Sequence, residues 1–351
     1  ADSDYHDYQD FIKSLGEFAF YEPLAEVMAR AGISLQERLD SEDCTEILDF
    51  LMEAQGLNYG SLPKGLIPFH RYSDHYRTAV EEHLVEAIHT LRDDKQCCRV
   101  HFTVTPENEK EVKNHGREAA ANYGANSGVE YELSFSLQSP ATNTLAVDLE
   151  NRPFRRPDGS LLFRPGGHGA LLQNLNRLHG DIVFIKNIDN VVNDDRRDLV
   201  IHHQRILAGM LVELQDAIFG YLRGLRAGSI GDQGIQEVLE FVTRHLGASL
   251  SEDFMSCSQE EKVSRLFRLL HRPLRVCGMV KHRGEPGGGP FWVEDTAGRL
   301  CLQIVENAEI DRDSSEQVAI LGASTHFSPV QIVCGLRDYM GQPFDLAQFA
   351  D

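Results

Sequence analysis

Residues 160–188 constrain the fold of this chain more than any other segment. A short apolar run at 161–163 ends at the glycine-rich turn 166–169, after which leucines recur at helical spacing up to Leu178. A second apolar run, at 182–185, shows no polar alternation, which is typical of a central strand buried on both faces. The order strand, turn, helix, strand predicts a βαβ unit within an α/β protein.

Periodic patterns elsewhere in the chain support the same fold class. The N-terminal segment 1–60 is predicted to be helical and peripheral. Further helices are predicted at 78–91, 105–124, 198–225, 234–246 and 259–271. Thr105 with Pro106 is expected to open the second of these, and a capping box of Ser258 and Glu261 the last. Strands are predicted near 99–105, 129–137 and 181–188, with a small β meander in 274–310.

These elements predict one mixed, mainly parallel sheet with helices on both faces, in which the strands near 99–105, 129–137 and 181–188 lie together. Ligands of such open sheets bind at the carboxyl ends of the strands. Polar residues and glycines that directly follow a predicted strand are therefore the candidate functional residues.

The charge of the chain limits its partners. The sequence has 54 acidic against 34 basic residues, a formal net charge of -20, which argues against nucleic acid, because its backbone needs a basic face. A locally positive site for a small anion stays open. No apolar run is long enough for a transmembrane helix, so no membrane partner is expected. The seven cysteines lack a disulfide-like spacing, so we expect a reducing, cytoplasmic compartment.

Two candidate sites have chemistry suited to a nucleotide. The backbone N–H groups of Gly166, Gly167, His168 and Gly169 could face a phosphate or a base edge, although a tight strand-to-helix turn explains the same glycines equally well. Asp189 follows the predicted central strand and could hold Mg²⁺ beside phosphates. The alternative is that Asp189 forms an Asx turn or a helix cap.

For the remaining candidate residues a structural explanation fits better than a functional one. The glycines 287–289 fit a flexible hairpin loop, and Lys64 in "LPKGLIPF" fits an ordinary solvated surface charge. The histidines lack a metal-ligand spacing and are interpreted as surface or packing residues. The chain has no HExxH, GxSxG or Walker A motif, which argues against zinc-dependent proteolysis, the α/β-hydrolases and the P-loop proteins.

Joined together, several motifs resemble a known group of enzymes. The passage "LPKGLIPFH" followed by "RTAVEEHLVEA" is similar to the "PKxLxPV" region of sugar nucleotidyltransferases. The passages "FRPGGHGALLQNL" and "DIVFIKNIDNV" are similar to "PGGHGDxYxxL" and "YxFVSNxDNL" of UDP-sugar pyrophosphorylases, in the same order and with similar spacing. Over nearly its whole length, with hallmarks such as "LNYGSLPKGL" and "GEPGGGPFWV", the chain is identified as a member of a bacterial, Bacteroidetes-type family of unknown function.

The resemblance implies a Rossmann-like nucleotidyltransferase fold of the glycosyltransferase-A type. It also implies four regions: a helical addition at 1–60, a nucleotide-binding α/β core at 61–200, a helical insertion at 201–272, and a sugar-binding β-rich part of the same core at 273–351. The implied activity joins a nucleoside triphosphate to a sugar 1-phosphate and releases pyrophosphate. The "GxGTRM"-like phosphate loop of these enzymes has no counterpart before Lys64 in this chain.

The resemblance further implies roles for individual residues. Lys64 would face phosphate charge, and Asp189 would bind Mg²⁺, so both are the expected catalytic residues. The turn 166–169 would approach the nucleoside, with Gln138 pairing with the base edge. The expected sugar-binding residues are Gly288, Glu306 and His326. The alternatives are a catalytically degenerate protein that binds a nucleotide sugar, and a glycosyltransferase on the related fold.

Overall fold

The computed structural model describes residues 2–41, 44–164, 166–248, 250, 252–283, 287–294 and 300–350. Contacts between Cα atoms divide the chain into two compact units. The first unit contains Ala1–Gln138 and Ile188–Ile201, and the second contains Ser139–Asn187 and His202–Asp351. The segment Ile188–Ile201, which carries Asp189, therefore packs with residues that are distant from it in sequence.

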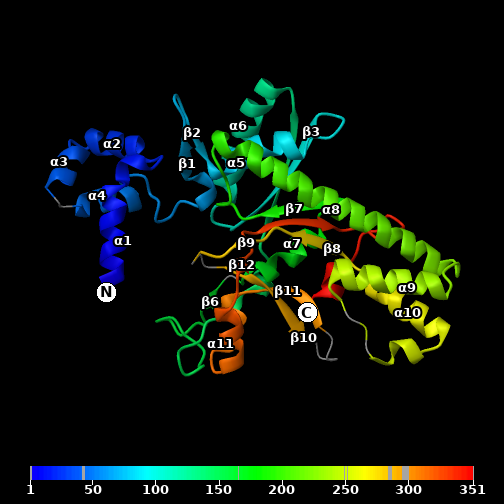
Figure 1. Ribbon diagram of the computed structural model, residues 1–351. Coiled ribbons are helices and arrows are strands. Elements are labelled where there is room, and N and C mark those ends of the chain that lie inside the picture. The colour runs from blue at the N-terminus through cyan, green and yellow to red at the C-terminus, as the bar shows by residue number, and fades with distance from the viewer. Residues whose placement is uncertain are drawn as a thin grey trace. The chain divides into compact units, whose positions relative to one another are not determined.

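The first 60 residues are helical, as their apolar spacing predicts, and they are drawn in blue in Figure 1. Their helices are α1 (Asp2–Lys13), the short η1 (Leu15–Glu17), α2 (Tyr21–Arg30), α3 (Leu35–Asp40) and α4 (Thr45–Met52). Leu24, Met28 and Ile47 are fully buried in a hydrophobic cluster made only of residues from this segment. These helices therefore stabilise one another rather than depending on a sheet.

The rest of the first unit contains a true βαβ unit. Its elements are η2 (Lys64–Leu66), β1 (Pro68–Arg71), β2 (Tyr76–Thr78), α5 (Ala79–Thr90), β3 (Cys97–Val104), α6 (Glu109–Ser127) and β4 (Glu130–Leu137). Strands β3 and β4 pair in parallel along their full length, and α5 and α6 pack beside them (Figure 1). The buried side chains of Leu84, Phe102 and Val112 join the helices to the strands.

Capping signals in the sequence predicted the start of α5 correctly and the start of α6 incorrectly. Thr78 and Glu81 form a reciprocal capping box, which starts α5 where the sequence predicts. Helix α6 begins at Glu109, so the prediction that Thr105 and Pro106 open it was wrong. A turn closed by the N–H of Asn108 on the carbonyl of Thr105 delays the helix by one turn.

The second unit contains a small antiparallel sheet with the order β7 (Ile182–Lys186), β13 (Gln331–Gly335), β8 (Leu274–Cys277). The prediction that 182–185 form a central strand buried on both faces was wrong. Strand β13 takes the centre, with Val333 fully buried, whereas β7 is an edge strand whose Ile182 is 36% exposed. The pairing of β7 with a strand some 145 residues later in the chain cannot be read from local pattern.

The α/β class is confirmed, but the predicted single, mainly parallel sheet was wrong for the described residues. Strands β3 and β4 form a sheet of their own, β7 lies in a different sheet, and only β3 and β4 pair in parallel among the described strands. The βαβ unit predicted at 160–188 is also absent there. Strand β6 (Phe163–Arg164) pairs antiparallel with β5 (Thr144–Leu145) and not with β7.

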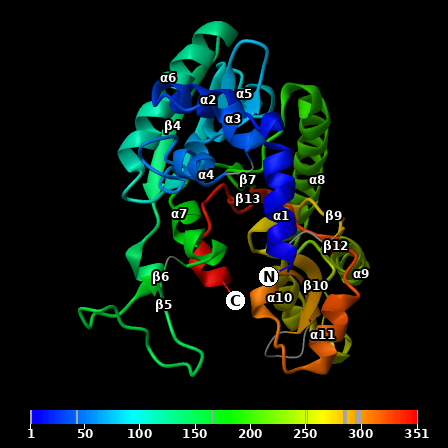
Figure 2. The same cartoon turned by 90° about the vertical axis from the view of Figure 1, so that its left-hand side faces the viewer.

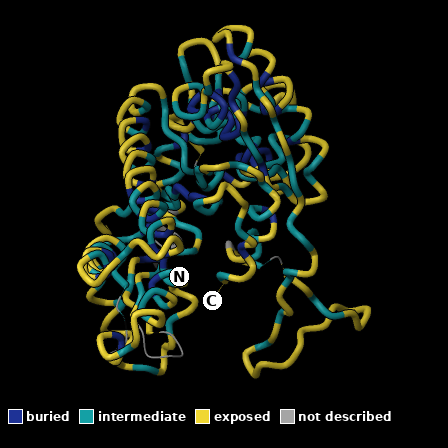
Figure 3. The backbone as a smooth tube through the Cα atoms, turned by 90° about the vertical axis from the view of Figure 1, so that its right-hand side faces the viewer, coloured by how far each residue is buried: buried dark blue, intermediate teal, exposed yellow. Residues whose placement is uncertain are grey.

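Between β5 and β6 the chain forms an arm, residues 146–162, which extends away from the rest of the second unit in Figure 2. Two hairpin-like bends build it, with isolated bridges between Val147 and Pro153 and between Arg155 and Leu161. Figure 3 shows that most of the arm is exposed, and Leu149 near one tip has no burial at all. The arm therefore adds almost nothing to the hydrophobic core.

Helices form the other large part of the second unit. They are α8 (Asp194–Arg226), α9 (Asp232–Phe241) with the π-helical continuation η5 (Val242–Leu246), and α10 (Gln259–Leu270). These positions confirm the three helices predicted between 198 and 271, and the Ser258 side chain caps α10 at the N–H of Glu261. The first residues of α8, up to Ile201, belong to the first unit. Leu222, Val238 and Leu266 form the centre of their shared core.

Short elements complete the second unit: η3 (Pro140–Thr142), η4 (His168–Leu171), α7 (Leu172–Asn176), η6 (Glu252–Ser256), β9 (Val280–Lys281), β10 (Gly289–Glu294), β11 (Leu300–Val305), η7 (Asn307–Glu309), α11 (Ser315–Gly322), β12 (His326–Phe327) and η8 (Leu346–Phe349). Strands β10 and β11 form the hairpin expected from the meander pattern, whereas β8 pairs with β13 instead. Within the described residues, every helix is too short or too polar to act as a transmembrane segment.

Candidate functional site

The two residues predicted to be catalytic lie side by side in the first unit. The Nζ atom of Lys64 is 3.0 Å from Oδ2 of Asp189, although the two residues are 125 positions apart in the sequence. Their side chains are 68% and 41% exposed, so solvent and solutes reach both charged groups. A lysine and a carboxylate in this arrangement offer one positive and one negative group to a phosphate and its counter-ion.

The backbone beside each of these residues holds the pair together. Gly65 is buried against Ile188, so that a Cβ atom at Gly65 would lie 3.5 Å from the Ile188 side chain and 3.1 Å from Val80. The carbonyl of Ile188 lies 3.1 Å from Nε2 of His83 on α5. Because Gly65 follows Lys64 and Ile188 precedes Asp189, this packing brings the two charged side chains to the same place.

A second set of charges lies in the same unit and was not predicted. The carboxylate of Glu82 is 1% exposed; its Oε1 accepts a 2.6 Å hydrogen bond from the Tyr72 hydroxyl and lies 2.9 Å from Nδ1 of His70. Arg77 reaches both Glu82, at 3.5 Å, and Asp194 at the start of α8, which it binds through both terminal nitrogens. We call Tyr72, Arg77, Glu82 and Asp194 the buried charge network.

The network keeps its carboxylate charged. Burial by itself would raise the pKa of Glu82, but hydrogen bonds from His70 and Tyr72 and the charge of Arg77 outweigh it and lower that pKa. Burial, together with the hydrogen bond to Glu82, raises the pKa of the Tyr72 hydroxyl, which therefore stays protonated and donates. Charged residues are rarely buried unless they are paired, so a sequence gives little reason to expect a buried glutamate. The only sequence feature that marks this network is the polar run "HRYSDHYRTAVEE", and such a run fits an exposed hairpin equally well.

In the predicted nucleoside turn, one glycine is needed for packing and two leave open space. A Cβ atom at Gly166 would lie 2.6 Å from the carbonyl oxygen of Thr142, whereas nothing lies within 4 Å of one at Gly167 or Gly169. None of these three glycines has a positive φ, so backbone strain does not explain them. The His168 side chain lies outside the described residues. Gly166 therefore allows the backbone of Thr142 to pack closely against the turn. Gly167 and Gly169 leave the surface beside them uncovered.

The three residues predicted to bind sugar gather in the second unit. A Cβ atom at Gly288 would lie 3.2 Å from the carboxylate of Glu306 and 2.9 Å from the Ile304 side chain. The carbonyl oxygen of His326, on β12, would lie 3.1 Å from a Cβ atom at Gly289. The absence of side chains at the two glycines thus allows Glu306 and the backbone of β12 to approach this end of β10.

The predicted site residues are divided between the units. Lys64, Asp189 and Gln138, which directly follows β4 and is partly buried, belong to the first unit, and the glycine-rich turn and the sugar-binding candidates belong to the second. In the described part of the chain no three His, Cys, Asp or Glu residues are close enough to hold a metal ion together. A metal at Asp189 would therefore need other ligands, such as substrate, water or carbonyl oxygens.

Comparison with known proteins identifies the family of this chain. No curated protein and no solved structure shows a significant match to the chain. The resemblance to UDP-sugar pyrophosphorylases consequently stays a prediction, whereas membership of a family of unknown function is confirmed. The model of that family matches residues 1–351, and the chain therefore belongs to the family described as Domain of unknown function (DUF4301).

Proposed function

We propose that this protein is a nucleotide-sugar pyrophosphorylase-like nucleotidyltransferase, and the observation that carries the proposal is the ion pair between Lys64 and Asp189. An exposed pair of this kind contributes only about 0–1 kcal/mol to stability, so stability alone gives little reason for these residues to meet. Phosphoryl-type transfer needs a cation near the phosphates and a carboxylate that holds Mg²⁺. The pair supplies both groups at one point.

The proposed reaction forms a bond between a sugar phosphate oxygen and the α-phosphorus of a nucleoside triphosphate, and it breaks the bond from that phosphorus to pyrophosphate. The attacking oxygen is already an anion, so the site needs orientation and charge neutralisation more than a general base. Lys64 would bind a phosphate oxygen and reduce the repulsion between the two anions. Substrate binding would accordingly separate Lys64 from Asp189.

The residues present suit Mg²⁺ only in company with a substrate. Mg²⁺ is commonly held by one or two carboxylates together with substrate phosphates and water, and Asp189 is a single, accessible carboxylate. When bound, Mg²⁺ would neutralise charge that develops on the phosphates. Asp189 would orient it, with Lys64 as the neighbouring cation that keeps the free carboxylate compensated.

In the second unit, the proposal assigns the nucleoside to the open surface at Gly167 and Gly169, and the sugar to Gly288, Glu306 and His326. The free space at the two glycines supports the first assignment, because a base needs a surface that no side chain covers. The closeness of Gly288 to Glu306 supports the second, because a carboxylate is a good acceptor for sugar hydroxyls. Gln138 is proposed to pair with the base edge.

One observation favours the degenerate binding protein as a second candidate. Lys64 already compensates Asp189, so the pair as it stands offers less charge to a transition state than two separate groups would. Such a protein would bind a nucleotide sugar without turnover. A glycosyltransferase would turn over but would release no pyrophosphate.

The deciding experiment measures pyrophosphate release by the protein with a panel of nucleoside triphosphates and sugar 1-phosphates, with and without Mg²⁺. We expect Mg²⁺-dependent release that falls at least about a hundredfold in Asp189→Asn and Lys64→Gln, as for removal of a charge that acts in the transition state. Asp198→Asn is the matched control, because Asp198 is exposed, lies in the same unit and makes no ion pair with any described residue. Nucleotide binding without release would favour the degenerate protein, and neither binding nor release would reject both candidates.

A further inference from the structure

The arm of the second unit has a defined backbone although none of its residues is buried. Hydrogen bonds within the arm hold it, among them one of 2.8 Å from the N–H of Phe154 to the carbonyl of Ala146. Its first bend is closed by Asp148, whose carboxylate accepts from the N–H groups of Glu150 and Arg152. The arm therefore presents its side chains in a fixed arrangement.

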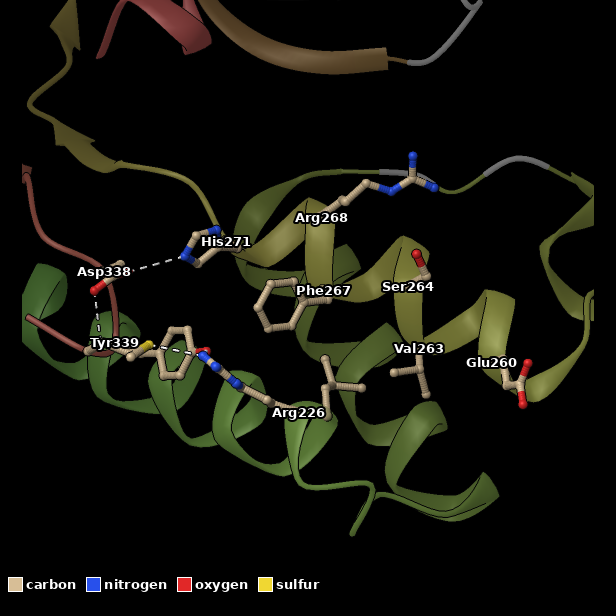
Figure 4. Close-up of a pocket in the computed structure, with 11 residues that line it drawn as sticks. Arg226, Glu260, Val263, Ser264, Phe267, Arg268, His271, Asp338 and Tyr339 are labelled. Carbon is tan, nitrogen blue, oxygen red and sulfur yellow. Dashed lines mark hydrogen bonds and ion pairs between the residues drawn. The ribbon is translucent and has the colours of Figure 1, made fainter. Parts of the chain in front are cut away.

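The loop that follows β13 contains the same bend in a packed setting. Asp338 accepts hydrogen bonds from the N–H groups two and four positions later, both at 2.8 Å, as Asp148 does in the arm at 3.0 and 2.9 Å. Figure 4 shows this second bend beside α10, where it lines a pocket and Asp338 lies 3.5 Å from His271. The residue six positions after the aspartate is a phenylalanine in both bends, Phe344 here and Phe154 in the arm.

The two phenylalanines differ in what covers them. The ring centroid of Phe344 lies 5.3 Å from that of His271 and 5.5 Å from that of Phe349, and the ring packs against a buried cluster. Phe154 is 49% exposed, and Leu149 at the tip of its bend has no burial at all. Exposed apolar surface of this kind often marks a site that binds another protein. The same bend is thus covered by protein after β13 and uncovered in the arm.

The charge of the arm indicates which surface fits it. Residues 153–164 contain three arginines and one acidic residue, in a chain whose formal net charge is -20. Arg155 and Arg156 are exposed, and neither forms an ion pair with any described residue. The pKa of Asp158 is lowered mainly by hydrogen bonds from Ser160 and less by the charge of Arg156, so this carboxylate offsets the arginines only in part. Guanidinium groups bind carboxylates and lie on aromatic faces, so the arm fits a surface that is acidic and aromatic.

The first 60 residues of the chain provide such a surface. They contain 14 acidic and three basic residues, which is more than half of the net charge of the chain. The ring centroids of Phe11 and Phe18 are 5.4 Å apart, and Phe18 is 38% exposed. Asp10 and Glu17 directly precede these phenylalanines, and both are exposed; Asp10 has only an exposed ion pair with Lys13, at 3.8 Å, which contributes little. We call Asp10, Phe11, Glu17 and Phe18 the acidic aromatic patch.

We propose that the arm of one copy of this chain binds the acidic aromatic patch of a second copy. Arg155 and Arg156 face the two carboxylates of the patch, and Phe154 covers the ring of Phe18. Each copy carries both an arm and a patch, so two copies form two identical contacts about a two-fold axis and close as a dimer. This contact does not depend on the proposed transferase activity, because it shares no residue with the groups assigned to nucleotide, metal or sugar.

Sedimentation velocity with the full chain tests this proposal. We expect a dimer at low ionic strength that weakens at about 0.5 M NaCl, because salt screens exposed charges. The arm variant, Arg155→Glu with Arg156→Glu, places like charges opposite each other and should raise the dissociation constant of the dimer at least about a hundredfold. The patch variant, Asp10→Lys with Glu17→Lys, should have an effect of the same size.

An equal mixture of the arm variant and the patch variant shows whether the two surfaces meet. In the mixed pair the reversed arm meets the reversed patch and the unchanged arm meets the unchanged patch, so both contacts regain opposite charges. We expect the mixture to dimerise with a dissociation constant within about tenfold of that of the parent, which also shows that both variants are folded. Mixing cannot restore a contact that an arm makes with its own chain.

Arg268→Glu with Arg272→Glu is the matched control, because both arginines are exposed, belong to the second unit and lie outside the arm. It changes the total charge as the arm variant does and should leave the dimer intact. Phe154→Ser, which changes no charge, should weaken the dimer at least about tenfold by removing the apolar contact. A monomeric parent, a dimer that survives either charge reversal, equal loss in the control, or a mixture that stays monomeric would overturn the proposal.

Discussion

Asp189 and Asp194 lie in the same short segment, and both pair with a cation from the N-terminal part of the chain, yet the two pairs differ in kind. The carboxylates are equally exposed, at 41% each. Their partners are not, since the side chain of Arg77 is 10% exposed and that of Lys64 is 68% exposed. The burial of the cation, rather than that of the carboxylate, separates a pair enclosed by the fold from a pair that solvent reaches.

Arg77→Met should produce the largest loss of stability. The substitution keeps much of the side-chain volume but leaves Glu82 buried without the arginine that faces it, and it leaves Asp194 with Arg197 as its remaining cation. Breaking a buried ion pair on one side costs about 3–5 kcal/mol, so we expect a decrease of that size in the free energy of unfolding in urea.

Arg117→Met on α6 is the control for Arg77→Met, because Arg117 is exposed and makes no ion pair with a described residue. It should change the free energy of unfolding by less than about 0.5 kcal/mol. Similar values for the two variants would mean that the buried charge network does not hold the fold.

Glu82→Gln should cost about 2 kcal/mol at pH 7, in the range for hydrogen bonds to a charged group. Because the pKa of Glu82 is lowered in the folded protein, its charge stabilises the fold above the ordinary carboxyl pKa of 4.5, and this contribution disappears as the pH falls through the lower, folded value. The difference in unfolding free energy between parent and variant should therefore shrink below about pH 4.5. Urea titrations from pH 7 to pH 3 measure it, and a constant difference would contradict a role for the charge.

The glycine-rich turn offers the same contrast between a packed and an open position. Gly166→Ala would place a Cβ atom 2.6 Å from the Thr142 carbonyl, so the backbone must shift, whereas Gly167→Ala meets nothing within 4 Å. We expect Gly166→Ala to lower the free energy of unfolding by at least about 1 kcal/mol, as for other overpacked sites. Gly167→Ala should leave it nearly unchanged, and equal effects of the two variants on thermal melting would show that the turn is not packed in this way.

Lys64→Gln, Asp189→Asn and the double variant should have the smallest effects on stability. Exposed ion pairs contribute about 0–1 kcal/mol, so each single variant should stay within that range, and the coupling energy from the double-mutant cycle should be below about 0.5 kcal/mol. A coupling energy above about 2 kcal/mol would assign the pair to the fold and remove the argument that a ligand opens it.

Lys64 and Asp189 were each predicted as site residues and the buried pair was not, but neither contact can be read from the sequence, for one physical reason. Asp189 stood out because it follows a predicted strand, and Lys64 became a candidate through the resemblance alone, but their contact depends on the packing of Gly65 against Ile188. Nothing near Arg77 in the sequence indicates that Asp194, 117 residues later, lies beside it. Burial of a charge is decided by its tertiary neighbours, and single residues do not encode it.

Where structure depends on neighbours one helical turn away, the sequence by itself determined it. The capping box of Thr78 and Glu81, the Ser258 cap of α10 and the helices between 194 and 270 required only contacts between residues three or four apart, whose geometry the backbone supplies. The tertiary structure alone decided which strands pair with β7. Residues 182–186 are apolar enough for a central strand, but β13 occupies the centre of that sheet, and the βαβ unit lies at β3, α6 and β4 instead. Strand pairing joins segments far apart in the chain, and many partners satisfy the same apolar pattern, so only the packing of the whole unit selects among them.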